Sequence, residues 1–260
     1  MVESVVYPKP WPLFWAAGAL ALGYLVVVLA LRWRLWARGM SLPAPPPAPR
    51  GKVAGIWFVE GFAQPQLLRL SRLRWAAHIG IFWGFLALVL LSTLHVGLRL
   101  LESLGLDGGA AGWLLRGDGR VALKLWGNVF GLVLLAGLLL GLARRVVPGA
   151  APADESRESD GPLLFFLLWL TLSGFLLEGL RVAAGADPAA AAALRPWLTA
   201  LWTIHGLSGV GLVAWVPHST LLHGLLAPLV IALNARNEHA RKDLAWHGSA
   251  RPPAPGSPRA

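Results

Sequence analysis

Five apolar stretches, each long enough to cross a lipid bilayer, constrain the fold of this 260-residue chain more than any other feature. Inside a membrane the backbone must satisfy its own hydrogen bonds, so isolated apolar stretches of this length form helices. The chain is also 56% hydrophobic and only 14% charged, a composition typical of membrane proteins. We therefore predict an all-α integral membrane bundle of five transmembrane helices within residues 1–235, followed by a disordered tail at 236–260. The spans are predicted at about residues 11–31, 76–100, 121–143, 162–182 and 197–233.

The last stretch is too long for one straight crossing. No turn signal lies between Trp197 and Pro217, and only about 16 apolar residues follow Pro217 before Asn234, too few for a separate crossing. Proline removes a backbone hydrogen bond and can kink a membrane helix without ending it. We therefore predict one bent helix over this stretch.

Basic residues set the predicted orientation. The loop after the first stretch is rich in Lys and Arg and carries one acid, Glu60, so the positive-inside rule places it in the cytoplasm. We expect the N-terminus outside and the C-terminus and tail in the cytoplasm, in the cytoplasmic membrane of a prokaryote. The net charge of +10 is largely this topological signal, and nothing else in the sequence supports nucleic-acid binding. The basic residues of this loop are Arg32, Arg34, Arg38, Arg50, Lys52, Arg69, Arg72 and Arg74.

Cysteine is absent from the sequence, and this narrows the possible chemistry. The chain cannot form a disulfide, a thiolate metal site or an iron–sulfur cluster of its own. If iron–sulfur chemistry is involved, another subunit must hold the cluster.

Four histidines mark the ends of two predicted spans. His78 and His95 lie about 25 Å apart along the second span, and His205 and His223 about 27 Å apart on one face of a continuous fifth span. Because these spans run in opposite directions, His78 matches His223 in depth and His95 matches His205. Zinc needs three or four ligands, whereas haem iron takes two axial imidazoles. The pattern favours two b-type haems over unrelated buried histidines, and His218, on the opposite face, is predicted to be a bystander.

A family resemblance supports this interpretation. The fifth span, HGLSGVGLVAWVPHSTLLH, resembles the gamma subunit of respiratory nitrate reductase, a five-span di-haem cytochrome b, at His205, Pro217, Ser219 and His223. The segment RWAAHIGIFWGF is more similar to the membrane cytochromes that serve cysteine-rich iron–sulfur subunits, including the E subunit of heterodisulfide reductase and the cytochrome of the sulfite-reduction-associated complex. The resemblance covers about residues 12–235.

One position departs from the nitrate reductase pattern. Ten residues after His78, where that pattern has its second histidine, this chain has Leu88. His95 lies two helical turns beyond Leu88 and on nearly the same face, so we take it as the replacement ligand.

The resemblance implies a subunit of a respiratory oxidoreductase that exchanges electrons between the quinone pool and a cytoplasmic iron–sulfur partner. A quinone site needs polar groups near the outer haem, and the candidates are Lys124, Asn128, Glu178 and Arg181. Interfacial anchoring, or an ion pair between Glu178 and Arg181 one helical turn apart, explains these four residues better than a quinone site does. Two other functions stay open: a redox-silent membrane anchor, and a transporter or proton channel that uses histidine as a relay. The transporter or proton channel predicts acidic residues within the spans, and the spans contain few of them.

Overall fold

The computed structural model describes residues 8–39, 55, 58–146, 161–222 and 226, and every structural statement below concerns these residues. His223 and the predicted tail lie outside them. The elements are α1 (Trp11–Gly39), a π-helical turn (Val59–Ala63), α3 (Pro65–Leu70), α4 (Arg72–Ser103), α5 (Gly109–Arg116), α6 (Asp118–Val146), α7 (Gly161–Ala184), α8 (Pro188–Trp215) and a 3-10 turn (Val216–His218).

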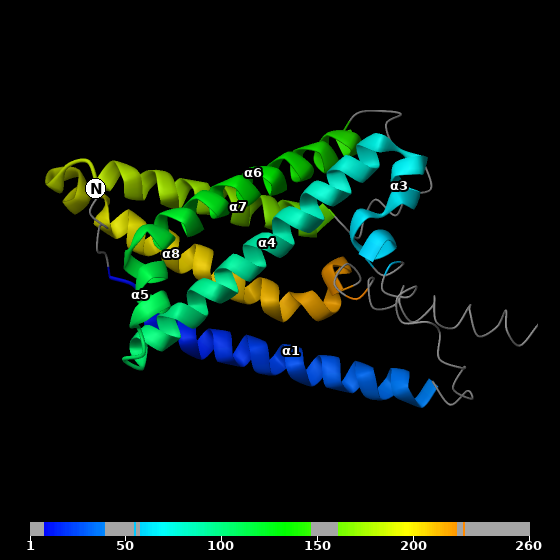
Figure 1. Ribbon diagram of the computed structural model, residues 1–260, viewed down its shortest axis with the longest axis horizontal. Helices are drawn as coiled ribbons and strands as arrows, with labels where there is room; N and C mark the ends of the chain where they lie inside the picture. Colours follow the sequence, from blue (N-terminus) through cyan, green and yellow to red (C-terminus); the bar gives the residue numbers. More distant parts are fainter. Residues whose placement is uncertain (1–7, 40–54, 56–57, 147–160, 223–225, 227–260) are drawn as a thin grey trace, which may run out of the picture.

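Five of these helices, α1, α4, α6, α7 and α8, are long and apolar enough to cross a membrane. No strand occurs in the described ranges, so the predicted all-α class with five spans is confirmed. Figure 1 shows the five lying roughly side by side along the long axis of the molecule, with α4 and α8 running in opposite directions. We call the end of the bundle that carries α5 the α5 end, and the opposite end, beside α3, the α3 end.

The start of α8 differs from the prediction. The helix begins at Pro188, nine residues before the predicted start at Trp197. Oδ2 of Asp187 accepts a hydrogen bond of 3.1 Å from the backbone N–H of Ala190, and Pro188 occupies the first turn, where its missing N–H has no cost. These two signals start the helix before its apolar run begins.

The predicted single bent helix is wrong at its far end. Helix α8 ends at Trp215, one 3-10 turn follows, and Ser219 has extended backbone angles of φ −111° and ψ 166°. The backbone N–H and the hydroxyl of Ser219 both donate to the carbonyl of Val216, at 3.2 and 3.1 Å. Pro217 has no N–H to continue the ladder, and these two bonds close the helix instead of carrying it on. The helix that carries His205 therefore ends before Ser219.

Packing divides the helices into linked pairs. Helix α4 packs most extensively against α6, α8 packs against α7 and α1, and α6 contacts α7. Buried leucines of α6, α7 and α8 form the main core. The backbones of α4 and α6 approach closely, because a Cβ added at Gly84 would lie 2.7 Å from the backbone N of Leu134. Figure 1 shows α1 running beside α8 in the same direction. The core leucines are Leu134, Leu138, Leu163, Leu167 and Leu212.

Candidate functional site

His205 has the best defined surroundings of the predicted ligands. Its Nδ1 lies 2.9 Å from the hydroxyl oxygen of Ser173 on α7, and that hydroxyl lies 3.1 Å from the carbonyl of Leu170, to which it donates. When the single hydrogen of this hydroxyl is donated to Leu170, its oxygen accepts from Nδ1–H of His205. That arrangement corresponds to the tautomer in which Nε2 carries the free lone pair.

Gly174, next to this serine, lets the imidazole ring of His205 pack against the backbone of α7. A Cβ added at Gly174 would lie 3.3 Å from Cε1 and 4.0 Å from Nε2 of His205, so the bare backbone lets the ring rest against α7. Ser173 itself is 2% exposed. The His205 ring is thus both oriented and supported, and its Nε2 suits a haem iron, the chemistry that the sequence predicts for it.

His78 lies near the start of α4, at the α3 end. Its Nε2 is buried, and its ring is parallel to that of Phe82, with 6.4 Å between centroids and 6° between planes. The π-helical turn covers this part of α4, because the indole N–H of Trp75 donates to the carbonyl of Ala63 at 2.7 Å. The predicted partner of His78, His223, lies outside the described residues, so this pairing stays a prediction.

His95 is exposed on α4, at the α5 end. Arg99 lies one helical turn beyond it on the same helix. In the described part of the chain no hydrogen bond joins it to His205, whose ring contacts α7. His95 and His205 would hold a haem iron between them without contacting each other, so this pairing also stays a prediction.

Three of the four predicted quinone-site residues come together at the α5 end. Glu178 forms an ion pair with Arg181 on the same helix, and its other oxygen lies 4.0 Å from Nζ of Lys124 on α6. Asn128 is exposed one turn further along α6. The predicted set is thus a cluster of one acid between two bases, with an amide beside Lys124.

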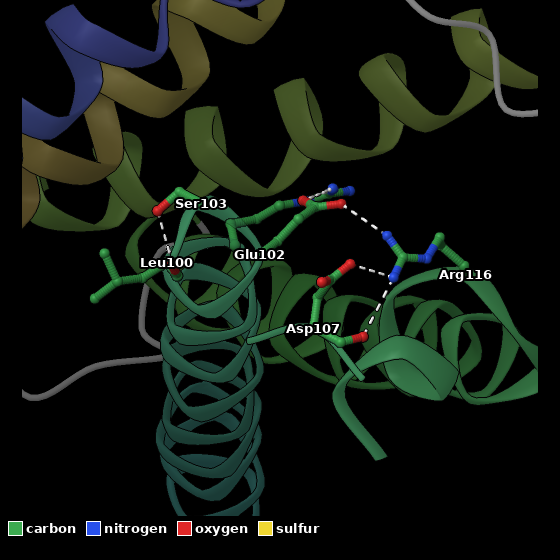
Figure 2. Close-up of polar contacts among 6 residues, drawn as sticks. Leu100, Glu102, Ser103, Asp107 and Arg116 are labelled. Atoms are coloured by element: carbon green, nitrogen blue, oxygen red, sulfur yellow. Dashed lines mark hydrogen bonds and ion pairs between the residues drawn. The ribbon is translucent and has the colours of Figure 1, made fainter. Parts of the chain in front are cut away.

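A second charged network, which the sequence analysis did not predict, ties α5 to the end of α4 (Figure 2). Nη1 of Arg99 donates to Oε2 of Glu102 at 2.6 Å, and Nη1 of Arg116 donates to Oε1 at 3.3 Å. Arg116 also forms an ion pair with Asp107 and donates to its backbone carbonyl at 3.2 Å. The hydrogen bond from Arg116 lowers the pKa of the Asp107 carboxyl and raises that of Arg116.

His218, the predicted bystander, has a specific partner. Its Nε2 lies 2.7 Å from the hydroxyl of Tyr24 on α1, and the two rings are 5.9 Å apart. At the other end of the same interface, the rings of Trp11 and Phe14 pack against Trp202 at 5.0 and 5.7 Å. His218 thus serves to hold α1 on α8. The sequence signal for Ser173 was its place beside glycine inside a span, whereas Tyr24 carried no local signal.

Within the described ranges, no group of three or more His, Asp and Glu side chains is placed to hold a metal ion. Nδ1 of His205 is engaged by Ser173, which leaves Nε2 as the ring nitrogen that could bind a metal.

Comparison with known proteins identifies the family. Residues 59–231 match the family described as the E subunit of dihydromethanophenazine:CoB--CoM heterodisulfide reductase. The corresponding protein of Methanosarcina mazei is 29% identical over 191 residues, which cover 70% of this chain and 68% of that protein. The corresponding protein of Methanosarcina acetivorans is 30% identical over 181 residues, which cover 67% of this chain and 64% of that protein.

A more distant relative is the EtfAB:quinone oxidoreductase of Syntrophomonas wolfei subsp. wolfei, 27% identical over 129 residues, which cover 49% of this chain and 16% of that protein. No solved structure matches. The family match extends over the region that contains α4 and α6 to α8. With five apolar helices and a match over well above half of its length, this multi-pass membrane chain belongs to the E-subunit family of heterodisulfide reductase, a family of membrane cytochrome b subunits.

Proposed function

We propose that this chain is the cytochrome b subunit of a respiratory oxidoreductase complex, and that it exchanges electrons between the quinone pool and a cytoplasmic iron–sulfur subunit. The family supports an electron-transfer role at the membrane. The names of the relatives mention dihydromethanophenazine in one case and a quinone in the other. The absence of cysteine means that any iron–sulfur cluster must belong to a partner.

The observation that carries the haem proposal is the hydrogen bond between His205 and Ser173. We assign His95 and His205 to the haem at the α5 end, and His78 and His223 to the haem at the α3 end. A b-type haem, when bound, supplies reversible one-electron transfer. The chain supplies the oriented imidazole, and the packing of α4 on α6 and of α8 on α7 holds the ligand helices.

The quinone site is proposed at the α5 end, around Glu178. Oxidation of a quinol releases protons with the electrons, so its site needs a proton acceptor. Glu178 is such a carboxylate, and Lys124 and Arg181 hold it from two sides. Asn128, exposed beside Lys124, adds an amide that can bind a quinone oxygen.

Topology follows from the same proposal. The basic loop after α1 is assigned to the cytoplasm, and with it the α3 end, where the iron–sulfur partner would dock. The α5 end then faces the outside of a prokaryotic cytoplasmic membrane, so protons released near Glu178 would leave on that side.

An absorbance spectrum of the purified, dithionite-reduced protein tests the proposal. We expect b-type bands from two haems, with about half of the signal lost in His205→Ala or His95→Ala and the other half in His78→Ala or His223→Ala. His218→Ala is the matched control, because its ring contacts Tyr24, and it should keep both haems.

The alternatives predict different results. A redox-silent anchor shows no b-type bands but still co-purifies with its partner subunits in mild detergent. A proton channel conducts protons in vesicles without any redox substrate. If the wild-type protein lacks b-type bands, the proposed function is wrong. If only His95→Ala keeps both haems, the ligand assignment fails at that residue alone.

A further inference from the structure

Arg99 occupies an unusual position on α4. It lies one helical turn beyond His95 toward the α5 end, about 6 Å along the axis. Its side chain is only 24% exposed, and its Nη1 donates to Glu102. Its Nε is buried and has no hydrogen-bond acceptor among the described residues. Because a buried guanidinium N–H without an acceptor costs free energy, this group points to a missing acceptor.

The negative charge available to Arg99 is shared. Glu102 offers one oxygen to Arg99 and the other to Arg116, so one carboxylate faces two guanidinium groups (Figure 2). Arg116 has a second acid, Asp107, whereas Arg99 has no other ion-pair partner among the described residues.

Helix α8 carries a matching feature. The hydroxyl of Thr199 is buried and has no hydrogen-bond partner in the described structure. Thr199 precedes His205 on α8, and Arg99 follows His95 on α4, so each lies on the α5 side of the histidine on its own helix. The two helices assigned to one haem thus each present a buried, unpaired donor at the same end.

We infer that Arg99, with Thr199, binds anionic oxygens, and that these belong to the propionate carboxylates of the haem held by His205. The guanidinium fork matches a carboxylate, and Arg99 has donors left for one. A lipid phosphate would present the same anionic oxygens, so the source of the anion must be tested. The inference rests on the proposed function, because it needs a haem at this end.

The binding of a propionate predicts a change in redox potential. Reduction adds a negative charge to the haem, and a nearby fixed positive charge favours the reduced form. Loss of one such charge at a partly buried site should shift the redox equilibrium about tenfold toward the oxidised form. For a one-electron couple, about tenfold corresponds to about 59 mV.

The experiment is a redox titration, followed by visible absorbance, of the full-length protein in nanodiscs of phosphatidylcholine with and without phosphatidylglycerol. In Arg99→Gln, the haem whose signal His205→Ala removes should titrate about 59 mV lower in both lipids. Arg99→Lys keeps the charge and should shift less. Arg116→Gln is the matched control, since Arg116 is 56% exposed and bonds the same Glu102, and its potential should stay at the wild-type value.

Thr199→Val removes a hydroxyl while conserving shape, and it should lower the same potential by a smaller amount even if Arg99→Gln binds no haem. An unchanged potential in both Arg99→Gln and Thr199→Val overturns the inference while leaving the haem assignment intact. A shift that appears only with phosphatidylglycerol overturns it too, because the anion is then a lipid phosphate. Absence of b-type bands in the wild-type protein instead refutes the proposed function.

Discussion

The glycine at position 84 offers the sharpest test of how the bundle is held together. It lies on α4, and a Cβ added there would be 2.7 Å from the backbone N of Leu134 and 2.8 Å from its Cα on α6. Ordinary van der Waals contact begins at 3.4 Å, so the two helices would have to separate by about 0.7 Å in Gly84→Ala. Because the opposing atoms are backbone, a side-chain rotation cannot relieve the contact.

The expected cost follows from that separation. Overpacking of a well-packed interface costs about 1–3 kcal/mol, and a clash between backbones belongs in the upper part of that range. Alanine gains up to about 1 kcal/mol over glycine in helix propensity. We therefore expect Gly84→Ala to lower the free energy of unfolding by about 1–2 kcal/mol. Gly97→Ala, on the same helix with nothing within 4 Å of the added Cβ, receives the propensity gain alone.

Thermal and denaturant unfolding in detergent micelles, followed by circular dichroism, measures the difference between the two variants. Gly137→Ala on α6 should behave like Gly84→Ala, because its Cβ would lie 2.6 Å from the backbone N of Ile81. Both changes push the same pair of helices apart, so the double variant should lose less stability than the two single losses added together. The reasoning is refuted if Gly84→Ala is as stable as Gly97→Ala.

Three further predictions concern polar contacts. Ser173→Ala removes the acceptor of Nδ1–H of His205, and the ratio of haem to protein should show a roughly 10–100-fold weaker hold on that haem. Tyr24→Phe breaks the hydrogen bond to His218, and a double-mutant cycle with His218→Ala, measured by unfolding in detergent, should give a coupling of about 0.6 kcal/mol. The hydrogen bond from α5 lowers the pKa of Asp107, so it stabilises the docking of α5 above the ordinary carboxyl pKa of about 4 and is lost as pH falls through the lowered value. The protection of the α5 amides, taken as the intrinsic exchange rate divided by the measured rate at the same pH, should fall on acidification in the wild type, and Asp107→Asn should show no such pH step.

The sequence predicts the number and approximate place of the membrane helices, because length and apolarity decide them almost alone. It predicts helix ends less well. The start of α8 depends on Asp187 as a cap and Pro188 in the first turn, both outside the apolar run. Its end depends on Ser219, whose two hydrogen bonds to Val216 compete with continuation of the helix. A hydropathy profile reports neither the helix cap at Asp187 nor the competing hydrogen bonds of Ser219.

The residues of the candidate site were likewise predicted only in part from the sequence. Histidine is rare enough in apolar helices to be noticed from sequence, and Glu178 and Arg181 stand one turn apart on one helix. The roles of Ser173 and Tyr24 were not predicted, because their hydrogen-bond partners lie 32 and 194 residues away in the sequence and come into contact only when the helices pack. Long-range contacts of this kind follow from the arrangement of the bundle, which single-sequence patterns do not determine.

The packing of the bundle positions α4 and α8, the two helices that carry the predicted haem ligands, through the helices between them. Helix α4 is fixed on α6 by backbone contact at Gly84, and α8 is tied to α7 by the hydrogen bond of His205. The spacing between α4 and α8 therefore depends on the leucine core that joins α6 to α7 and α8. A change in that core, such as Leu138→Ala, should disturb the relative placement of the ligand helices although it touches no histidine. Because cavities in tight cores relax only partly, this effect should exceed that of an equal change on the exposed face of α1.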